Sequence, residues 1–333
     1  MKCVGEGSHR VILILADSTD PWAILIYREA QRSGAQVRWV EPANLLDRVV
    51  LNWPVEAESV IVRGSLTIDD TIIPLSDLTG VFSRLTLPLP LQLGELSPED
   101  RDYVVKESTA AWLAILNALP CAVVNRPVLG GRPVVLSGSP FLSRLAEEQG
   151  IRLPSSRCTS DPADATWQFS TWRERVYVKR LGSEEPGLYL SAQSGIEQIR
   201  RIMETSAISM QAVPDGRRMT VYVAGHDVAA SVVRGDERQG TETEVPFLPN
   251  RPCLDLVRRL GLAFAECRCV LTAEGAVYCL DVSPRPSYWH CPQEVQQEIV
   301  RRLVGYLSEM RSLTFHDSLS GADGRSGARE RLR

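Results

Sequence analysis

The sequence predicts an α/β protein in which a parallel sheet is followed by two lobes of mixed helices and strands. Strand and helix patterns alternate over the first third, and a segment rich in proline, glycine and serine at 126–140 marks a boundary. An apolar strand also ends abruptly at Asp281–Pro284. With 333 residues and 44% hydrophobic content, the chain is long enough for two or three domains. We expect them at 1–125, 126–210 and 211–313.

In the first third of the chain, helix-capping residues and helix-breaking glycines predict where the helices begin and end. Asp20 and Pro21 begin a helix that Gly34 ends, and Ser97 with Pro98 begins another. The strand, helix, strand order implies a parallel sheet with ligands at the carboxyl ends of its strands. The expected elements are 10–16, 21–33, 36–40, 59–63, 66–68, 72–75, 80–85, 97–119 and 122–125. Asp69 and Asp70 should form the turn of a hairpin between 66–68 and 72–75.

Later segments follow the same signals. A polar loop at 182–187 should be mobile or wrapped on a ligand, and Gly225 marks the turn of a hairpin. Residues 314–333 have no apolar period, so we expect a disordered tail. The expected helices are 141–149, one that begins at Asp161, 254–261 and 293–310. The expected strands are a short one after Gly150, 176–179, 219–224, 228–233, 264–272 and 277–283.

Composition excludes several classes of function. A net charge of -4 gives no footprint for nucleic acid, and no basic block or long apolar run points to a membrane. We therefore expect a soluble, cytoplasmic protein. The eight cysteines form no C-x-x-C pair, and buried free thiols are favoured over a zinc site built from Cys267, Cys269, His290 and Cys291.

The last strand carries the first candidate site. Alternation along 277–283 places Cys279, Asp281 and Ser283 on one face, so a carboxylate and a hydroxyl meet at a strand end, where a hard cation can be held. Lys179 ends another apolar strand just before a glycine-containing loop. It is either a phosphate ligand or a solvated strand-end lysine.

The order of these features resembles the ATP-grasp superfamily over residues 10–310. The closest resemblance is to its glutathione-synthetase and RimK-like branch, which includes ligases that mature ribosomal peptides. This implies a Rossmann-like amino-terminal domain and two α+β lobes with the cleft between them. The matching motifs are Gly80–Leu85, Val123–Pro127, Ser137–Phe141, Gly150–Pro154, Tyr177–Lys179 and Ala276–Tyr288.

The resemblance implies an ATP-dependent carboxylate–amine ligase that works on a peptide or amino acid through an acyl phosphate, as in natural-product maturation. The cofactors of such a ligase would be ATP and Mg²⁺. The resemblance does not decide whether the protein is a monomer or a homodimer. The residues that would contact ATP are Lys179, Gly182, Ser183, Gln211 and Val213. Those that would hold the metal are Asp281, Ser283 and Glu266.

The chain departs from the family pattern at four positions. Ser139 occupies a position where the family has a lysine, and Thr220 one where it has an arginine. Arg268 replaces a metal-binding aspartate. The Glu-x-Asn that the family has in the last strand is replaced by Asp281 and Ser283. Displaced substitutes are available two residues away on the same strand faces. Glu266 would take the metal, and Arg218 or Arg268 the phosphate. Alternatively, Glu266 and Arg268 form a structural ion pair.

Three further residues are candidates for substrate binding. Arg84 ends a strand at the crevice of the parallel sheet, and Arg285 and Tyr288 follow the last strand. An arginine binds a carboxylate through two hydrogen bonds. The rival hypothesis is a degenerate ATP-grasp protein that binds a peptide or partner without catalysis, and a third keeps the fold but gives the cleft another ligand.

Overall fold

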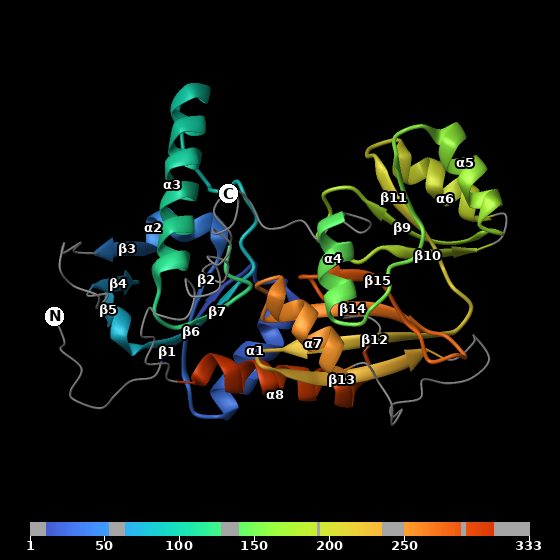
Figure 1. Ribbon diagram of the computed structural model, residues 1–333. Coiled ribbons are helices and arrows are strands. Elements are labelled where there is room, and N and C mark those ends of the chain that lie inside the picture. Colours follow the sequence, from blue (N-terminus) through green and yellow to red (C-terminus); the bar gives the residue numbers. More distant parts are fainter. Residues whose placement is uncertain are drawn as a thin grey trace, which may run out of the picture.

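The structure is a computed structural model that describes residues 11–52, 64–127, 140–191, 194–234, 250–287 and 291–309. Its amino-terminal part is a parallel four-stranded sheet in the order β2-β1-β6-β7 (Figure 1). These strands and their helices are β1 (Val11–Leu15), α1 (Pro21–Arg32), β2 (Gln36–Val40), β6 (Leu78–Ser83), α3 (Pro98–Ala118) and β7 (Ala122–Val124). The predicted parallel sheet is confirmed.

Alternation along these strands explains how the sheet is covered. Ile12 and Ile14 pack with α1 and with α8 (Gln293–Ser308), whereas Leu13 packs with the carboxyl-terminal half of α3. Asp20 caps α1 by accepting a hydrogen bond from the backbone of Ala23. The parallel sheet is thus buried on both faces.

A small antiparallel sheet, β3-β4-β5, flanks the parallel one. Asp69 and Asp70 have φ values of 46° and 62°, which suit a tight hairpin turn, and the predicted hairpin is confirmed. Strand β3 was not predicted, and the strand expected at 59–63 lies outside the described residues. The elements here are η1 (Pro42–Asn44), α2 (Leu45–Arg48), β3 (Val49–Asn52), β4 (Ser65–Ile68), β5 (Thr71–Pro74) and η2 (Leu75–Asp77).

The middle of the chain forms an antiparallel sheet in the order β10-β9-β11-β8, with α5 and α6 on its outer face (Figure 1). The sequence did not predict β10, α6 and β11. The polar loop at 182–187 was read as separate from a strand, so the hairpin of β9 and β10 was missed. The elements are α4 (Pro140–Glu148), β8 (Ser156–Thr159), α5 (Pro162–Thr171), β9 (Arg175–Arg180), β10 (Leu188–Ser191), α6 (Ser194–Met203) and β11 (Ile208–Ala212).

The last sheet has the order β13-β12-β14-β15. Helices α7 and α4 cover one face, while the other face packs on α8 at one end and on β9 at the other. The candidate site lies where this face meets the β9 sheet, a region called the cleft below. The elements are β12 (Arg217–Ala224), β13 (Asp227–Arg234), α7 (Asn250–Arg259), β14 (Phe264–Leu271) and β15 (Val277–Ser283).

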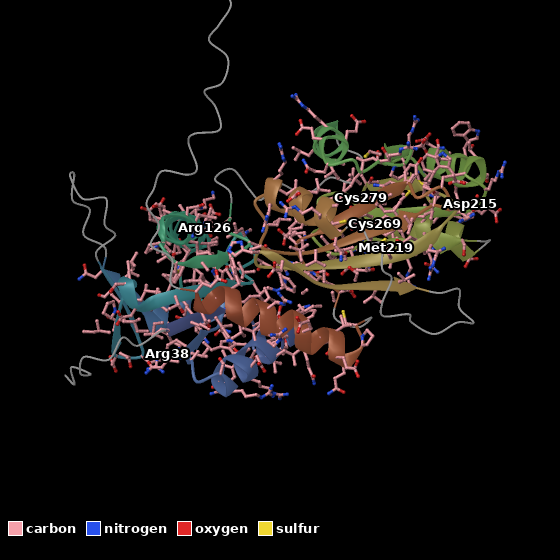
Figure 2. The ribbon with its side chains drawn as sticks, turned by 60° about the horizontal axis from the view of Figure 1, so that its bottom comes forward. Arg38, Arg126, Asp215, Met219, Cys269 and Cys279 are labelled. Carbon is pink, nitrogen blue, oxygen red and sulfur yellow. The ribbon has the colours of Figure 1, made fainter. Side chains whose placement is uncertain are left out.

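A register shift in β15 corrects one expectation. Arg268 pairs with Asp281, but Cys269 pairs with Cys279, so Leu280 is an extra residue in the strand. Such a bulge reverses the alternation. Cys279 therefore packs with α7 and with Cys269, both cysteines being labelled in Figure 2. Asp281 lies on the opposite face, contrary to the prediction that Cys279 and Asp281 share one.

Asn125 ties the first sheet to the last. It has a φ of 51°, donates to the carbonyls of Phe264 and Pro284, and accepts from the amides of Ala263 and Phe264. It thereby fixes the start of β14 and the end of β15, which lie side by side at one end of the strand pair that carries the site. The division of the chain into three domains stays a prediction. Within the described residues, no helix has the length and apolarity needed to cross a membrane.

Candidate functional site

The centre of the cleft is a buried ion pair. Lys179 Nζ, near the end of β9, lies 2.9 Å from Asp281 Oδ1 on β15, and their side chains are 4% and 1% exposed. The buried lysine contradicts the solvated strand-end alternative. Lys179 and Asp281 thus face each other from the two sheets and contact directly.

Tyr177 completes the surroundings of this carboxylate. Its hydroxyl donates to Asp281 Oδ2 at 2.8 Å and accepts from the Gly187 amide at 2.6 Å. Burial and the nearby Asp281 charge raise the pKa of Tyr177 well above its usual value, so the hydroxyl keeps its proton. Sequence reasoning missed Tyr177, although its position two residues before Lys179 puts both on one strand face.

A second buried pair lies beside the first. Arg268 Nε donates to Glu266 Oε1 at 2.6 Å, and the two side chains are 8% and 1% exposed. Arg268 Nη1 also donates to the Gly187 carbonyl at 2.7 Å, while the amide of Ser287 donates to the other Glu266 oxygen. The structure therefore selects the structural ion pair over the displaced metal ligand.

The loop at 181–187 is fastened to the end of β15. Ser283 Oγ donates to the carbonyl of Glu184, and Arg285 Nε lies 2.7 Å from Glu184 Oε2. At the far end of the loop, a Cβ on Gly187 would come 2.5 Å from the Val178 carbonyl and 2.7 Å from the ring of Tyr177. The loop thus packs too closely there for any side chain, and Arg285 is bound within the protein.

The other nucleotide candidates lie around the same cleft. Gln211 is buried, and its Oε1 has no hydrogen-bond partner among the described residues, while Val213 packs on Tyr177. The guanidinium of Arg218 lies 4.5 Å from the centre of the Tyr189 ring, where it makes a cation–π contact.

The loop residues adopt turn geometry. Gly182 has a φ of 81°, and Ser183 Oγ accepts a hydrogen bond from the Glu185 amide. Their assignment to ATP stays a prediction.

The remaining candidates do not join this cluster. Arg84 Nε lies 2.9 Å from Asp20 Oδ2, and Asp20 also caps α1, so Arg84 holds a strand end to a helix start. Thr220 is buried opposite Arg268 in the strand register. Tyr288 and Ser139 lie outside the described residues.

These residues do not fit a magnesium ion. Mg²⁺ needs several hard oxygen ligands and excludes a cation from its position. Both oxygens of Asp281 accept hydrogen bonds, both oxygens of Glu266 do the same, and Ser283 donates to a backbone carbonyl. Within the described part of the chain, no group of three or more His, Cys, Asp or Glu residues is arranged to hold a metal. The three metal assignments stay predictions that this geometry opposes.

The zinc alternative is not supported either. Cys267, Cys269 and Cys279 are buried free thiols beside Cys253 of α7, and Cys253 Sγ lies 3.8 Å from Cys269 Sγ. His290 lies outside the described residues. The expectation of buried free thiols is met for the described cysteines except Cys158, which is exposed.

Comparison with known proteins identifies the fold. No family model and no curated protein matches the chain. Among solved structures, macrocyclase MdnC bound with precursor peptide MdnA, from Microcystis aeruginosa MRC, matches with a TM-score of 0.62 at 13% identity, over 88% of this chain and 99% of that one. A RiPP-associated ATP-grasp ligase from Chryseobacterium gregarium, in complex with ADP and a leader and core peptide, matches with a TM-score of 0.61 at 12% identity, over 89% and 97%.

A third match is a RimK domain protein. The RimK domain ATP-grasp protein of Sphaerobacter thermophilus DSM 20745 aligns with a TM-score of 0.52 at 17% identity, over 89% of this chain and 98% of that one. This chain therefore has the ATP-grasp fold. The resemblance predicted from its motifs is confirmed at the level of the fold, and at these identities the matches speak for the fold alone.

Proposed function

We propose that this protein is a non-catalytic ATP-grasp protein that binds a peptide. The observation that carries the proposal is the pairing of every charged candidate at the centre of the cleft with another protein group. Lys179 is paired with Asp281, and Arg268 with Glu266. Groups that would grip phosphate and metal instead hold the two sheets together.

Free energy argues in the same direction. Breaking a buried ion pair by removing one partner costs about 3 to 5 kcal/mol, because a charge is left in a poorly solvating interior. Mg²⁺ would have to take Asp281 from Lys179, and the loop would have to release Arg268 from Gly187. A binding-competent state that costs this much is rarely populated, and the apparent affinity falls by the same factor.

The peptide part of the proposal rests on the structural neighbours. MdnC was crystallised with its precursor peptide, and the Chryseobacterium ligase with a leader and core peptide. This chain covers nearly the full length of both, so it retains the architecture that accommodates a peptide in those proteins. A cytoplasmic location and a homodimeric assembly stay predictions.

The second candidate is the carboxylate–amine ligase that the motifs imply. Its support is that Lys179 and Asp281 occupy one site in an ATP-grasp fold whose neighbours include a ligase crystallised with Mg and ADP. In that case nucleotide binding would separate the pair, and Lys179→Ala would weaken ATP binding by more than about tenfold, because it removes a charge-assisted contact to phosphate.

Calorimetric titration of the full chain with ATP in 5 mM Mg²⁺ separates the two candidates. We expect no saturable heat up to about 1 mM ATP, and no ADP release when peptides are added. The double variant Arg268→Asp with Ser283→Asn restores two of the family's metal ligands beside Asp281, and we expect it to bind Mg²⁺–ATP more tightly than the wild type. Arg180→Gln, at an exposed position of β9, is the matched control.

Two results would overturn the proposal. A dissociation constant below about 100 µM for the wild type, abolished by Lys179→Ala, would show a working nucleotide site. Peptide-dependent ADP formation would show the ligase itself. If the double variant stays silent, the cleft has been remodelled beyond Arg268 and Ser283.

A further inference from the structure

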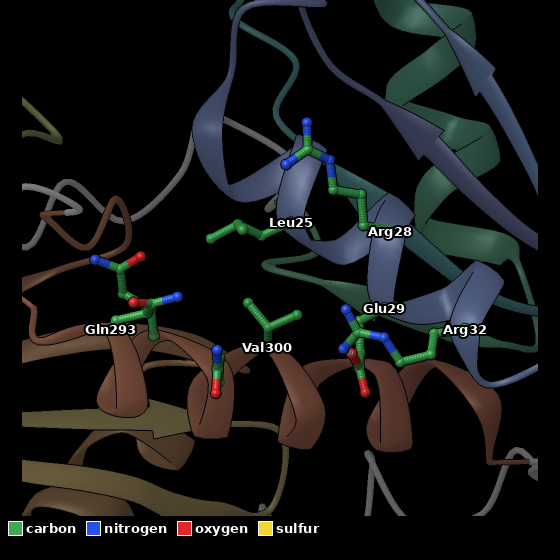
Figure 3. A pocket seen from close by; sticks show the side chains of 8 residues that line it. Leu25, Arg28, Glu29, Arg32, Gln293 and Val300 are labelled. Carbon is green, nitrogen blue, oxygen red and sulfur yellow. Dashed lines mark hydrogen bonds and ion pairs between the residues drawn. The ribbon is translucent and has the colours of Figure 1, made fainter.

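A groove between α1 and α8 shares no residue with the cleft. It has a volume of about 480 Å³ and opens on the side of the amino-terminal sheet where the two helices pack together (Figure 3). This volume lies within the range of sites that hold small ligands or short peptide segments. The polar side chains that line it are Arg28, Glu29, Arg32, Gln293, Gln296 and Gln297.

The base of the groove is apolar. Leu25 of α1 and Val300 of α8 belong to the cluster that joins the helices to the sheet, and Val300 is 4% exposed. Figure 3 shows Val300 rising from α8 toward Leu25. An aliphatic side chain placed between them would leave water on contact with an existing core.

The charges of the groove are unequal. Arg32 is paired with Glu29, so these two largely cancel. Arg28 is exposed and has no ion-pair or hydrogen-bond partner among the residues that the structure describes. One guanidinium group therefore remains, with the fork geometry that matches a carboxylate.

The glutamine side chains of α8 add hydrogen-bond donors and acceptors to the groove. Gln296 Nε2 donates to the carbonyl of Cys291 at 2.7 Å, which fixes this side chain at the start of α8. The side chains of Gln293 and Gln297 make no hydrogen bond within the described part of the chain. A primary amide offers a donor and an acceptor, as does each peptide unit of an extended backbone.

We propose that this groove binds a short extended segment of a partner peptide, with one carboxylate on Arg28 and a neighbouring aliphatic side chain between Leu25 and Val300. A single uncompensated positive charge suits a monoanionic side chain better than a polyphosphate. The inference extends the proposed peptide binding to a site outside the cleft, and since it uses only α1 and α8 it requires no nucleotide.

Two peptide pools test the groove on the full chain. One is acetyl-X-X-Glu-X-X-amide and the other acetyl-X-X-Gln-X-X-amide, with X any residue except cysteine. Each is dialysed against the protein in 50 mM salt without nucleotide, and bound peptide is quantified by mass spectrometry. We expect about threefold more binding of the Glu pool, the size of a solvent-exposed ion pair, and loss of this preference in 500 mM salt.

Variants locate the effect. Arg28→Gln should abolish the preference for the Glu pool, whereas Arg201→Gln, an exposed arginine on α6, should preserve it. Equal binding of the two pools, no binding of either, or a preference that survives Arg28→Gln would each overturn the inference. Stronger competition by 10 mM inorganic phosphate than by acetate would overturn it too, because it would identify a general anion site. None of these results depends on the ATP titration, so the two proposals fail separately.

Discussion

The cleft and the α1–α8 groove use charged side chains in opposite ways. In the cleft, Lys179 and Arg268 are buried and each donates to a carboxylate within 3 Å. In the groove, Arg28 and Arg32 are exposed, and Arg28 has no partner among the described residues. Charges that the fold has already satisfied stabilise the fold, while charges left in water are available to a ligand.

The two regions also differ in how they can be recognised: the cleft from family resemblance, and the groove from the three-dimensional structure. The cleft occupies the place where the ATP-grasp fold leads one to expect ATP, yet its polar groups contact one another. No family motif marks the groove, which becomes visible only when two helices about 270 residues apart in sequence are brought together. Family resemblance therefore marks the cleft as a candidate site, whereas only the structure reveals the α1–α8 groove.

The largest expected effect is on the buried pair. Lys179→Met removes the cation that lies 2.9 Å from the buried Asp281, and we expect the free energy of unfolding to fall by about 3 to 5 kcal/mol. Urea titration measures this change. The matched control is Lys106→Met on α3, whose partner Asp102 is exposed, and it should cost at most about 0.5 kcal/mol.

A small loss of unfolding free energy for Lys179→Met would contradict the contrast between the cleft and the groove. If both lysine variants changed stability by less than 1 kcal/mol, the Lys179–Asp281 pair would be an easily opened contact, and the cleft would again be a candidate for nucleotide. Combining Lys179→Met with Asp281→Leu should recover part of the loss, since both charges are then gone.

The second prediction concerns the Tyr177 hydroxyl. Tyr177→Phe removes its hydrogen bonds to Asp281 and Gly187, and should cost about 1 to 3 kcal/mol at pH 7. The native pKa of Tyr177 is raised by burial, so the unfolded chain releases this proton first as the pH rises. Stability present below pH about 10 should therefore decline above it in the wild type.

Comparing pH series isolates this contribution. In Tyr177→Phe, the decline above pH 10 should be shallower than in the wild type, whereas Tyr103→Phe, at a position 65% exposed, should leave it unchanged. Parallel curves for the wild type and Tyr177→Phe would mean that Tyr177 ionises as readily in the folded protein as in the unfolded one.

Most of the fold could be predicted from the sequence because its signals are local. Caps such as Asp20 and Ser97 and the turn at Asp69 and Asp70 act within a few residues, and each gave an element where it was expected. Strands β3 and β10 lack such signals. Their strand conformation depends on the neighbours with which they pair.

The site was harder to predict because its pairings join distant segments. Spacing alone placed Glu266 and Arg268 on one face, but it could not decide whether they bind each other or a metal ion. The bulge at Leu280 could not be foreseen either, since nothing in its local sequence marks it, and it moved Cys279 to the other face.

The smallest expected effect on stability is that of replacing Arg28 in the groove. Arg28→Gln changes an exposed side chain without a described partner, so the free energy of unfolding should move by less than about 0.5 kcal/mol at any salt concentration. Arg32→Gln also loses the pair with Glu29 and should cost a little more in 50 mM than in 500 mM salt. Urea titrations in both buffers test this. A loss above 1 kcal/mol for Arg28→Gln would mean that this arginine stabilises the fold, and the contrast between a satisfied cleft and an available groove would no longer hold.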